Sequence, residues 1–359
     1  MLKAIDLFAG CGGFSCGFER AGFRIKTAVE FDPMIAKTYA YNHSDVNLLI
    51  SDIAKVDNKR YFHKNEADLI IGGPPCQGFS MAGARIRHDF VDDPRNYLFK
   101  HYVNIVKIVR PKMFIFENVK GILHYQKGAI FTNIEKVFEE MGYKLQYSVV
   151  CAKDFGVPQA RERTILIGSL FNFSLDKEIE RTKKDIKKTY PYFFKTPTVW
   201  DAIGNLPQPT HSGIIAAPKP KTLYQRELKG KQLKINNHIA TNHKFNIIAR
   251  MGKIEKNQNF RVLHENIKSI HSGSYGRLDA QGVAATITTR FDTPSGGKFI
   301  HPIENRTITP REAARLQSFP DDFKFMGNKS SICRQIGNAV PPKMAYFFGM
   351  MLRRLLNDK

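Results

Sequence analysis

Cysteine is scarce in this chain, and the cysteines present are not arranged in pairs. The 359-residue sequence has 5 cysteines, which are Cys11, Cys16, Cys76, Cys151 and Cys333. Their number is odd and no two are spaced as CxxC, which argues against a disulfide framework and against a tetrahedral zinc site. We therefore expect reduced thiols and no bound metal.

Long hydrophobic runs are also missing. No stretch approaches the roughly 18 uninterrupted apolar residues that a membrane-spanning helix needs. The sequence opens on a predicted strand, MLKAIDLFAG, rather than on a cleavable leader. A hydrophobic content of 42% is nevertheless enough to bury a sizeable core. We expect a soluble, cytoplasmic and nucleoid-associated protein with no membrane contact.

Acidic residues are few relative to basic ones. The sequence has 33 Asp and Glu against 55 Lys and Arg, a formal net charge of +22. Part of the excess is local, because residues 219–261 contain eleven Lys or Arg and only two acids, Glu227 and Glu255. Such an excess favours a polyanion such as nucleic acid, although a solvated face is the alternative for any basic stretch. This stretch also has few apolar anchors, which predicts an irregular contact surface.

The order of apolar segments predicts an α/β fold with a parallel sheet. Short apolar runs alternate with segments of helical spacing, as crossover connections require. The expected strands are 3–8, 24–30, 67–72, 113–117 and 164–168, and the expected helices are 35–41, 97–109, 130–141, 310–317 and 344–356. Prolines and lysines interrupt the pattern after residue 170. We predict a first domain over 1–169, a smaller irregular domain over 170–325 and a C-terminal segment, 326–359, that returns to the first domain.

One thiol stands directly after a predicted buried strand. Gly72, Gly73 and two prolines end the strand and hold Cys76 on a rigid turn. Catalytic groups are often mounted at this position in open α/β sheets. A cysteine attacks as the thiolate, and its free pKa of about 8.5 means that a neighbouring cation or acid must assist it near neutral pH. The alternative is a buried structural thiol, but the residues that flank Cys76 favour catalysis.

A glycine-rich turn closes the first predicted strand. Residues 6–15, DLFAGCGGFS, lead from that strand into a helix, the usual place for a nucleotide-like ligand. The dinucleotide fingerprint would need glycine where Ser15 stands, which disfavours nicotinamide chemistry. Glu30 ends the second strand, where it can bind ribose hydroxyls, and Asp52 is placed to read an adenine amine. Each acid taken alone could instead be a helix cap.

Six blocks, in this order, resemble the DNA cytosine-5 methyltransferase family. They are DLFAGCGGFS (6–15), GGPPCQGFS (72–80), ENV (117–119), QARER (159–163), REAARLQSFPDDF (311–323) and GNAVPP (337–342). They span nearly the whole chain except 171–274, where this family carries its variable target-recognition region. The resemblance implies a Rossmann-like catalytic sheet that binds S-adenosylmethionine, a smaller irregular target-recognition domain, and double-stranded DNA as the substrate.

The resemblance also implies roles for individual residues. Matched by position, Cys76 is the nucleophile. The implied cofactor shell consists of Phe8, Gly10, Cys11, Gly13, Glu30, Phe31, Asp52, Ile53, Leu98, Asn338 and Val340. The resemblance also implies that the helix carrying Arg311 and Arg315 organises the recognition domain and does not contact bases.

The residue types suit methylation of a pyrimidine carbon. Cytosine C5 is a poor nucleophile, but addition of a thiolate at C6 makes the ring an enamine that can attack a methyl sulfonium. Glu117, at the end of its own strand, is placed to donate a proton or hydrogen bond at N3. Arg161 and Arg163 alternate along one extended segment, so we expect them to share a face and to bind the ring carbonyl or a phosphate. A surface strand is the alternative for that pair.

Access to such a site requires the target base to leave the duplex. Segment 77–96, which contains Gly78, Ser80, Gly83, Arg85 and Arg87, has few large apolar residues and suits a lid that closes over DNA. No side chain in the matched blocks is an obvious base for the C5 proton, so we expect water to take it.

The same residues distinguish this function from three others. A DNA-binding module without chemistry is disfavoured because Cys76 and Glu117 are both present, and amino-group methylation would need an acid or amide in place of Gly73. A tRNA-methylating relative stays open, although such enzymes carry an additional Cys-Phe-Thr and no cysteine lies between Cys151 and Cys333. We expect a monomeric bacterial modification enzyme that protects DNA from a cognate restriction endonuclease.

The sequence does not identify the methylated site. A Thr-Leu dipeptide marks recognition regions of this family, and two places match it, Thr222 with Leu223 and Thr198 with Val199. We choose neither, because base contacts in irregular loops depend on side-chain geometry.

Overall fold

The computed structural model describes residues 1–74, 98–124, 128–265 and 272–358. Contacts within the chain divide it into two compact units. The first unit consists of Met1–Cys151, Glu162–Phe193 and Met344–Lys359, and the second of Ala152–Arg161 and Phe194–Lys343. The domain bounds expected from the sequence, 1–169, 170–325 and 326–359, stay a prediction.

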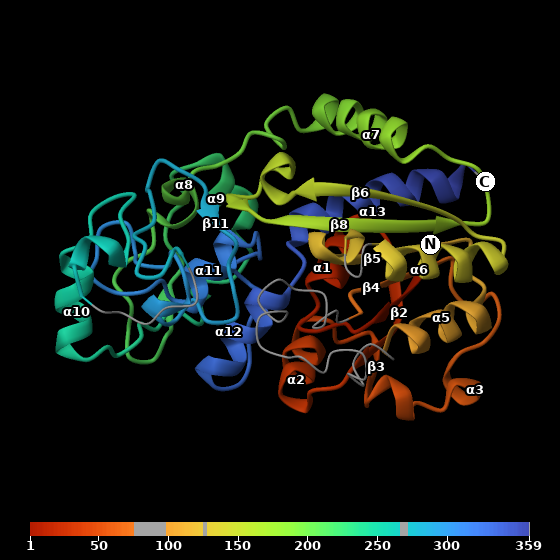
Figure 1. Cartoon of the computed structure of the whole chain (residues 1–359), viewed down its shortest axis with the longest axis horizontal. Coiled ribbons are helices and arrows are strands. Elements are labelled where there is room, and N and C mark those ends of the chain that lie inside the picture. Colours follow the sequence, from red (N-terminus) through yellow and green to blue (C-terminus); the bar gives the residue numbers. More distant parts are fainter. Residues whose placement is uncertain (75–97, 125–127, 266–271, 359) are drawn as a thin grey trace. The chain divides into compact units, whose positions relative to one another are not determined.

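A seven-stranded sheet forms the centre of the first unit (Figure 1), in the order β3-β2-β1-β4-β5-β8-β6. The strands are β1 (Lys3–Leu7), β2 (Arg24–Glu30), β3 (Asn47–Ile50), β4 (Leu69–Gly72), β5 (Met113–Val119), β6 (Lys144–Cys151) and β8 (Glu162–Ser169). Strands β1 to β5 pair in parallel. Because β1 leads outward to β2 and β3 while β4 leads the other way to β5, the order reverses between β1 and β4, and ligands bind at such points in open α/β sheets.

The predicted strands are present, each within two residues of its expected bounds, but one direction needs correction. Strand β8, predicted at 164–168, runs antiparallel to both β5 and β6. It follows β6 through Ala152–Arg161, which contains no crossover helix, and a strand connected in this way reverses its direction. Strand β6 was not predicted, because this edge strand is half exposed and mixes polar with apolar residues.

Helices cover both faces of this sheet. The unit contains α1 (Gly13–Arg20), α2 (Pro33–Asn42), α3 (Asn58–Tyr61), α5 (Leu98–Val109), α6 (Ala129–Glu140), α7 (Leu175–Thr189) and most of α13 (Pro342–Asn357). Ile5 and Leu7 belong to a buried cluster, the aromatic core cluster, which includes Tyr102 of α5, Phe114 and Phe116 of β5, and Phe138 of α6. Asp6, between them in β1, points to the opposite face and accepts a hydrogen bond from Ser15 of α1. Helix α13 packs closely on α1, since a Cβ on Gly349 would lie 2.6 Å from the Cβ of Ala21.

The second unit is built mostly from short elements, as the interrupted pattern predicts. They are β7 (Gln159–Ala160), α8 (Val199–Ile203), β9 (Ile215–Ala216), α9 (Leu223–Leu228), β10 (Lys234–Ile235), α10 (Phe245–Gly252), β11 (Ala284–Ala285), α11 (Pro310–Leu316) and α12 (Lys329–Asn338). Strands β9 and β10 form an antiparallel ribbon, and β7 pairs in parallel with β11.

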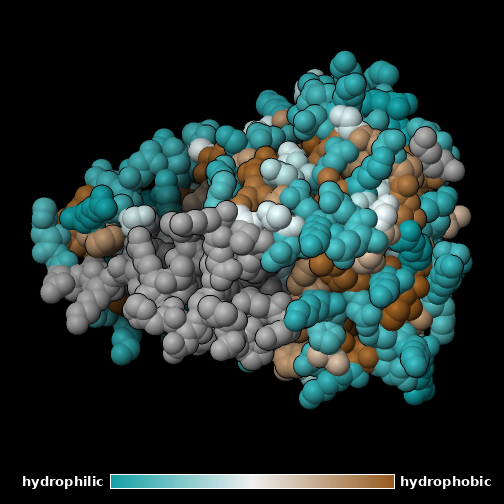
Figure 2. All heavy atoms as spheres, turned by 45° about the vertical axis from the view of Figure 1, so that its right-hand side comes forward, coloured by the Kyte–Doolittle hydropathy of each residue, from teal (hydrophilic) through white to brown (hydrophobic). Residues whose placement is uncertain are grey.

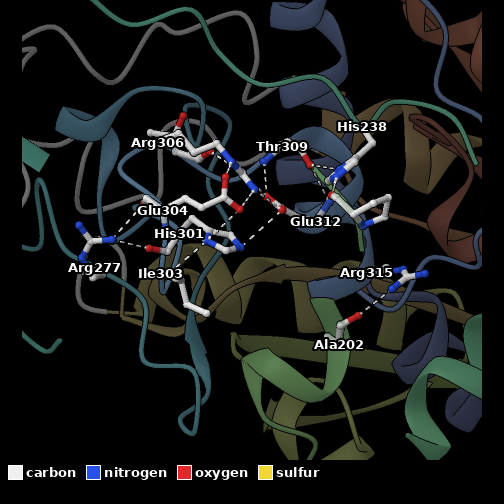
Figure 3. Close-up of polar contacts among 12 residues, drawn as sticks. Ala202, His238, Arg277, His301, Ile303, Glu304, Arg306, Thr309, Glu312 and Arg315 are labelled. Atoms are coloured by element: carbon white, nitrogen blue, oxygen red, sulfur yellow. Dashed lines mark hydrogen bonds and ion pairs between the residues drawn. The ribbon is translucent and has the colours of Figure 1, made fainter. Parts of the chain in front are cut away.

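A buried ionic network surrounds the start of α11 (Figure 3). Thr309 caps the helix, and Glu312 closes a capping box by accepting from the Thr309 N–H at 2.7 Å. Both Glu312 oxygens also accept from Arg306, at 2.8 Å each. Burial acts to raise the pKa of Glu312, but the hydrogen bonds and charge of Arg306 outweigh it and lower that pKa to about 2. The carboxylate therefore stays ionised inside the unit.

Buried arginines bind main-chain carbonyls around this network. Arg311 donates to the carbonyls of Asn236, Pro320 and Phe323 at 2.7–3.1 Å. Arg277 donates to the carbonyls of Met251, Ile254, His301 and Glu304 at 2.6–2.9 Å. Arg315 binds the carboxylate of Asp321 through two nitrogens, both at 2.8 Å. These side chains connect segments that are distant in the sequence, in agreement with the organising role expected for the helix of Arg311 and Arg315.

The visible surface of the protein is largely hydrophilic, with separate apolar patches (Figure 2). Within the described ranges, no helix is both long enough and apolar enough to cross a membrane.

Candidate active site

Two of the predicted site segments leave the sheet at neighbouring strand ends. The glycine-rich turn follows β1 and the approach to Cys76 follows β4, and these strands pair with Leu7 opposite Gly72. Pro74 is the last described residue of the second segment. Cys76 and the lid expected at 77–96 therefore lie outside the described residues.

The glycine-rich turn contains two glycines in the left-handed region, for different reasons. Gly12 has φ +95°, and a Cβ there would lie 2.3 Å from Nε2 of His43, so packing requires glycine. Gly10 has φ +57°, and no atom of the described residues lies within 4 Å of the place where its Cβ would be. The turn thus presents bare backbone with open space above it at Gly10, which suits close approach of a ligand.

Glu30 joins the end of β2 to this turn. Its Oε2 accepts from the N–H of Gly10 at 2.8 Å, and its Oε1 accepts from the N–H of Asp32 at 2.8 Å. Each carboxylate oxygen has a further lone pair with which it can accept from a ribose hydroxyl. Burial raises the pKa of Glu30, even though both backbone bonds act to lower it. The next residue, Phe31, is 69% exposed and presents a ring on which a base can stack.

The remaining expected cofactor residues have mixed surroundings. Oδ1 of Asp52 accepts from the Ala54 N–H at 3.0 Å, so this residue caps a short helical turn, which was the alternative to a role in cofactor binding. Its other carboxylate oxygen does not take part in the cap in the described contacts. Ile53 belongs to the aromatic core cluster, and Phe8 and Leu98 pack against it. Cys11 is buried, which raises the pKa of its thiol, and Gly13 begins α1. Asn338 and Val340 belong to the second unit, so their part in the cofactor shell stays a prediction.

A series of side-chain hydrogen bonds beside the glycine-rich turn joins β1, α1 and α2. Ser15 donates to Oδ2 of Asp6 at 2.6 Å, and its hydroxyl lies 2.8 Å from that of Tyr39. Burial raises the pKa of Asp6 to about 7, although the bond from Ser15 acts to lower it. From the sequence, Ser15 served only to show that the dinucleotide fingerprint lacks a glycine. Its hydrogen bond to Asp6, which joins α1 to β1, could not be predicted from residue spacing.

Glu117 and Arg163, two of the four predicted catalytic residues, form an ion pair. Nε of Arg163 lies 2.7 Å from Oε1 of Glu117, and the two side chains are 15% and 10% exposed. Among the described residues this oxygen receives no well-aligned hydrogen bond, so the contact is ionic and leaves acceptor capacity. A Cβ on Gly73 would lie 3.9 Å from Oε2 of Glu117, which places the carboxyl group beside the approach to Cys76.

Asn118 holds that approach in position. Its side-chain amide donates to the carbonyl of Pro74 at 3.2 Å, and its own Oδ1 accepts from the Val119 N–H at 2.8 Å. Asn118 has no role predicted from the sequence, although it stands in the ENV block next to Glu117. Its presence in that matched block was the one signal that could have identified it.

Arg161 has different partners from Arg163. Its Nη1 donates to the carbonyls of Gly337 at 3.0 Å and Ile287 at 3.4 Å, and the residue is 2% exposed. The expectation of a shared face assumed one regular strand, but β7 ends at Ala160 and β8 begins at Glu162. The alternation is broken between them, and the described contacts of Arg161 are structural. Its catalytic role stays a prediction.

Gln159 connects two matched blocks of the second unit. Its Nε2 donates to Oε1 of Gln317 at 2.8 Å, and its Oε1 accepts from the Ile287 N–H at 2.8 Å. Gln317 in turn donates to the Ile336 carbonyl at 2.6 Å. Gln159 and Gln317 therefore join two of the matched blocks in one polar framework that extends to the residue before GNAVPP, a role not predicted from the sequence.

Neither Thr-containing dipeptide is distinguished by these contacts, because Thr198 caps α8 and Thr222 caps α9. Across the residues that the structure describes, no three His, Cys, Asp or Glu side chains gather into a group that could hold a metal ion.

Comparison with known proteins identifies the family. The family model described as C-5 cytosine-specific DNA methylase matches residues 2–353. The chain is 36% identical over 349 residues to Type II methyltransferase M1.HphI of Haemophilus parahaemolyticus, covering 96% of this chain and 84% of that relative. It is 33% identical over 373 residues to Type II methyltransferase M.DdeI of Desulfomicrobium norvegicum, covering 96% and 86%.

Solved structures agree with this assignment. A DNA modification methyltransferase encoded within a prophage of E. coli superposes with a TM-score of 0.79 at 30% identity, covering 99% of this chain and 100% of that one. The Dnmt2 methyltransferase of S. pombe has a TM-score of 0.64 at 17% identity, with 99% of both chains covered, and supports the fold alone. The chain belongs to the C-5 cytosine-specific DNA methylase family and is a DNA (cytosine-5-)-methyltransferase.

Proposed function

We propose that this enzyme transfers a methyl group from S-adenosylmethionine to C5 of a flipped-out cytosine in a specific double-stranded DNA sequence, through a covalent bond between Cys76 and C6. The observation that carries the proposal is the Glu117 carboxyl group, held by Arg163 beside Gly73, at the strand next to the one that leads to Cys76. The proposed acid thus lies on β5, beside β4, the strand that precedes Cys76 in the sequence.

The donor side of the site has the features that S-adenosylmethionine needs. Open space above Gly10 suits close approach of the ligand to backbone, and Glu30 retains lone pairs for the ribose hydroxyls. The exposed ring of Phe31 offers a stacking surface for adenine. When bound, the donor supplies an electrophilic methyl group on a sulfonium.

The protein residues then have separate tasks. The Cys76 thiolate adds to C6 of the cytosine while Glu117, which must first take up a proton because an ionised carboxylate only accepts, donates that proton or a hydrogen bond at N3, where negative charge develops. Arg163 positions the Glu117 carboxyl group. C5 takes the methyl group as the methyl–sulfur bond of the donor breaks and its electron pair stays on the donor sulfur, and the N3 proton returns to Glu117. Water then removes the C5 proton, and the electron pair of that C–H bond forms the C5–C6 double bond and expels the Cys76 thiolate. The cost of unstacking the target base, a few kcal/mol, is offset by contacts with the protein.

Replacement of Glu30 by glutamine is expected to weaken donor binding roughly 10- to 100-fold, the effect of losing charge-assisted hydrogen bonds. The carboxylate accepts from Gly10 and Asp32, whereas an amide would place its NH2 group against one of these donors. Because burial raises the pKa of Glu30, wild-type affinity should fall as the pH is lowered, at a higher pH than for an exposed glutamate, and the variant should lack this dependence.

Calorimetric titration with S-adenosylmethionine at several pH values measures both effects. Glu66→Gln is the matched control, because Glu66 pairs with Lys26 and has no part in the turn. Equal donor affinity in wild type and Glu30→Gln would contradict the assignment of Glu30.

Bisulfite sequencing of DNA from cells that express the protein tests the overall function. We expect protected cytosines at one recurrent sequence in the DNA and none in transfer RNA from the same cells. Protection confined to RNA would favour the tRNA-methylating alternative. The Type II relatives named above lead us to propose protection from a cognate restriction endonuclease, and such an enzyme should fail to cut the modified DNA.

A further inference from the structure

The basic stretch at 219–261 consists of two parts with different surroundings. In its later part, Arg250 pairs with Glu265 at 2.7 Å and Lys256 with Asp279 at 3.0 Å. Its earlier part carries six exposed cations, and no ion pair to any of them occurs within the described ranges. This basic strip consists of Lys219, Lys221, Arg226, Lys229, Lys231 and Lys234.

The acid within the strip does not neutralise it. Glu227 is the one acidic residue between Lys219 and Lys234, and its Oε2 lies 2.5 Å from Nζ of Lys343. That lysine is 7% exposed and comes from outside the stretch. Because Lys343 takes up the charge of Glu227, the six cations of the strip repel one another without compensation from their own segment.

The backbone under the strip is firmly attached, so the cations cannot separate freely. In α9, the hydroxyl of Tyr224 donates to the carbonyl of Arg315 at 2.7 Å, and the carbonyl of Leu228 accepts from Asp321 at 2.8 Å. In the ribbon, Ile215 pairs with Ile235 on the buried face, which leaves Lys234 and Ala216 exposed as a pair on the other. A concentration of like charge on a fixed scaffold is stabilised when a polyanion binds to it.

The chemistry of the strip favours phosphate over bases. Lysine is a compact point charge without the planar fork that arginine uses to read guanine, and all members of the strip except Arg226 are lysines. Phosphate contacts fix a protein on the duplex without carrying sequence information.

We propose that the basic strip binds the phosphate backbone of the DNA substrate and supplies affinity that does not depend on sequence. The inference rests on the proposed function only in taking double-stranded DNA as the substrate. Selection of the target sequence then depends on other residues of the second unit.

The test compares binding by the whole protein of two fluorescent duplexes, one with the methylated sequence and one with it scrambled, over a series of salt concentrations without donor. Each phosphate contact contributes about 0.9 to the slope of log affinity against log salt concentration. The triple variant Lys229→Gln, Lys231→Gln, Lys234→Gln should lower that slope by about 2 to 3 and weaken both duplexes by the same factor, roughly tenfold or more. The matched control is Lys177→Gln, Lys184→Gln, Lys187→Gln in α7, which removes equal charge from the first unit and should leave the slope unchanged.

An unchanged slope in the triple variant, or an equal fall in the control, would overturn the proposal. A loss confined to the methylated sequence would also overturn it, because the strip would then read bases. Should the triple variant not fold, Lys231→Gln alone must still lower the slope by about 0.9. Since no methyl transfer takes place in this assay, a failure of the covalent mechanism would leave its result unaffected.

Discussion

Replacement of Cys76 by serine is expected to lower the rate of methyl transfer by a factor on the order of 10⁴ to 10⁶, the usual effect of removing a nucleophile. A serine hydroxyl is almost entirely protonated near neutral pH and cannot add to C6 as a thiolate does. Binding of DNA and of donor should change little, because the substitution replaces one atom. Single-turnover transfer of a labelled methyl group to a duplex that carries the target sequence measures the effect.

A duplex with 5-fluorocytosine at the target position provides the second readout. Fluorine cannot leave as the C5 proton does, so wild type with donor should form an adduct that survives denaturation, whereas Cys76→Ser should form none. Cys151→Ser is the matched control, since this thiol lies at the end of β6 and has no assigned role, and it should retain the adduct. Methylation by Cys76→Ser at a rate near wild type would disprove the covalent mechanism.

Replacement of Glu117 by glutamine is expected to lower single-turnover transfer about 10²- to 10⁴-fold, the usual contribution of a positioned general acid. Glutamine keeps the shape of the side chain and can donate a hydrogen bond, but it cannot supply a proton at N3. Affinity for the duplex should change far less than the rate constant, because the interaction strengthens as charge develops in the transition state.

The ion pair between Glu117 and Arg163 leads to a related prediction for Arg163. Arg163 binds Glu117 at 2.7 Å, so Arg163→Met should also slow transfer, and the double variant should be slowed by less than the product of the two single effects. Glu162→Gln is the matched control, because this exposed neighbour pairs with Lys120 at 3.4 Å and should transfer at the wild-type rate. Strict multiplication of the two single effects would show that Arg163 acts independently of Glu117.

The sequence predicted those parts of the fold that local patterns determine. Strand β2 has its predicted bounds, and β4 was recognised because Leu69, Ile70 and Ile71 are buried on both faces. The glycine-rich turn and Glu30 were predicted to lie at the same edge of the sheet, because such a turn and the end of the next parallel strand meet there. The hydrogen bond that joins Glu30 to Gly10 was not predicted.

Features that depend on long-range contacts were not predicted. Strand β8 runs antiparallel because it follows β6 through a connection without a crossover helix, and the residues of β8 themselves do not indicate its direction. Arg161 and Arg163 look equivalent by spacing, yet the break between β7 and β8 gives one of them carbonyl partners and the other a carboxylate. Asn118 was overlooked because its partner is the backbone of Pro74, 44 residues away in the chain.

On the proposal that the second unit selects the DNA sequence, its buried arginines affect how that selection can change. Arg311 and Arg277 hold their surroundings through peptide oxygens of seven residues, and a peptide oxygen is present whatever amino acid occupies the position. Outward-facing side chains on those segments can therefore mutate while their anchorage is preserved. Under the proposed function, we expect substitutions of recognition side chains on this scaffold to change the target sequence with little loss of folding stability.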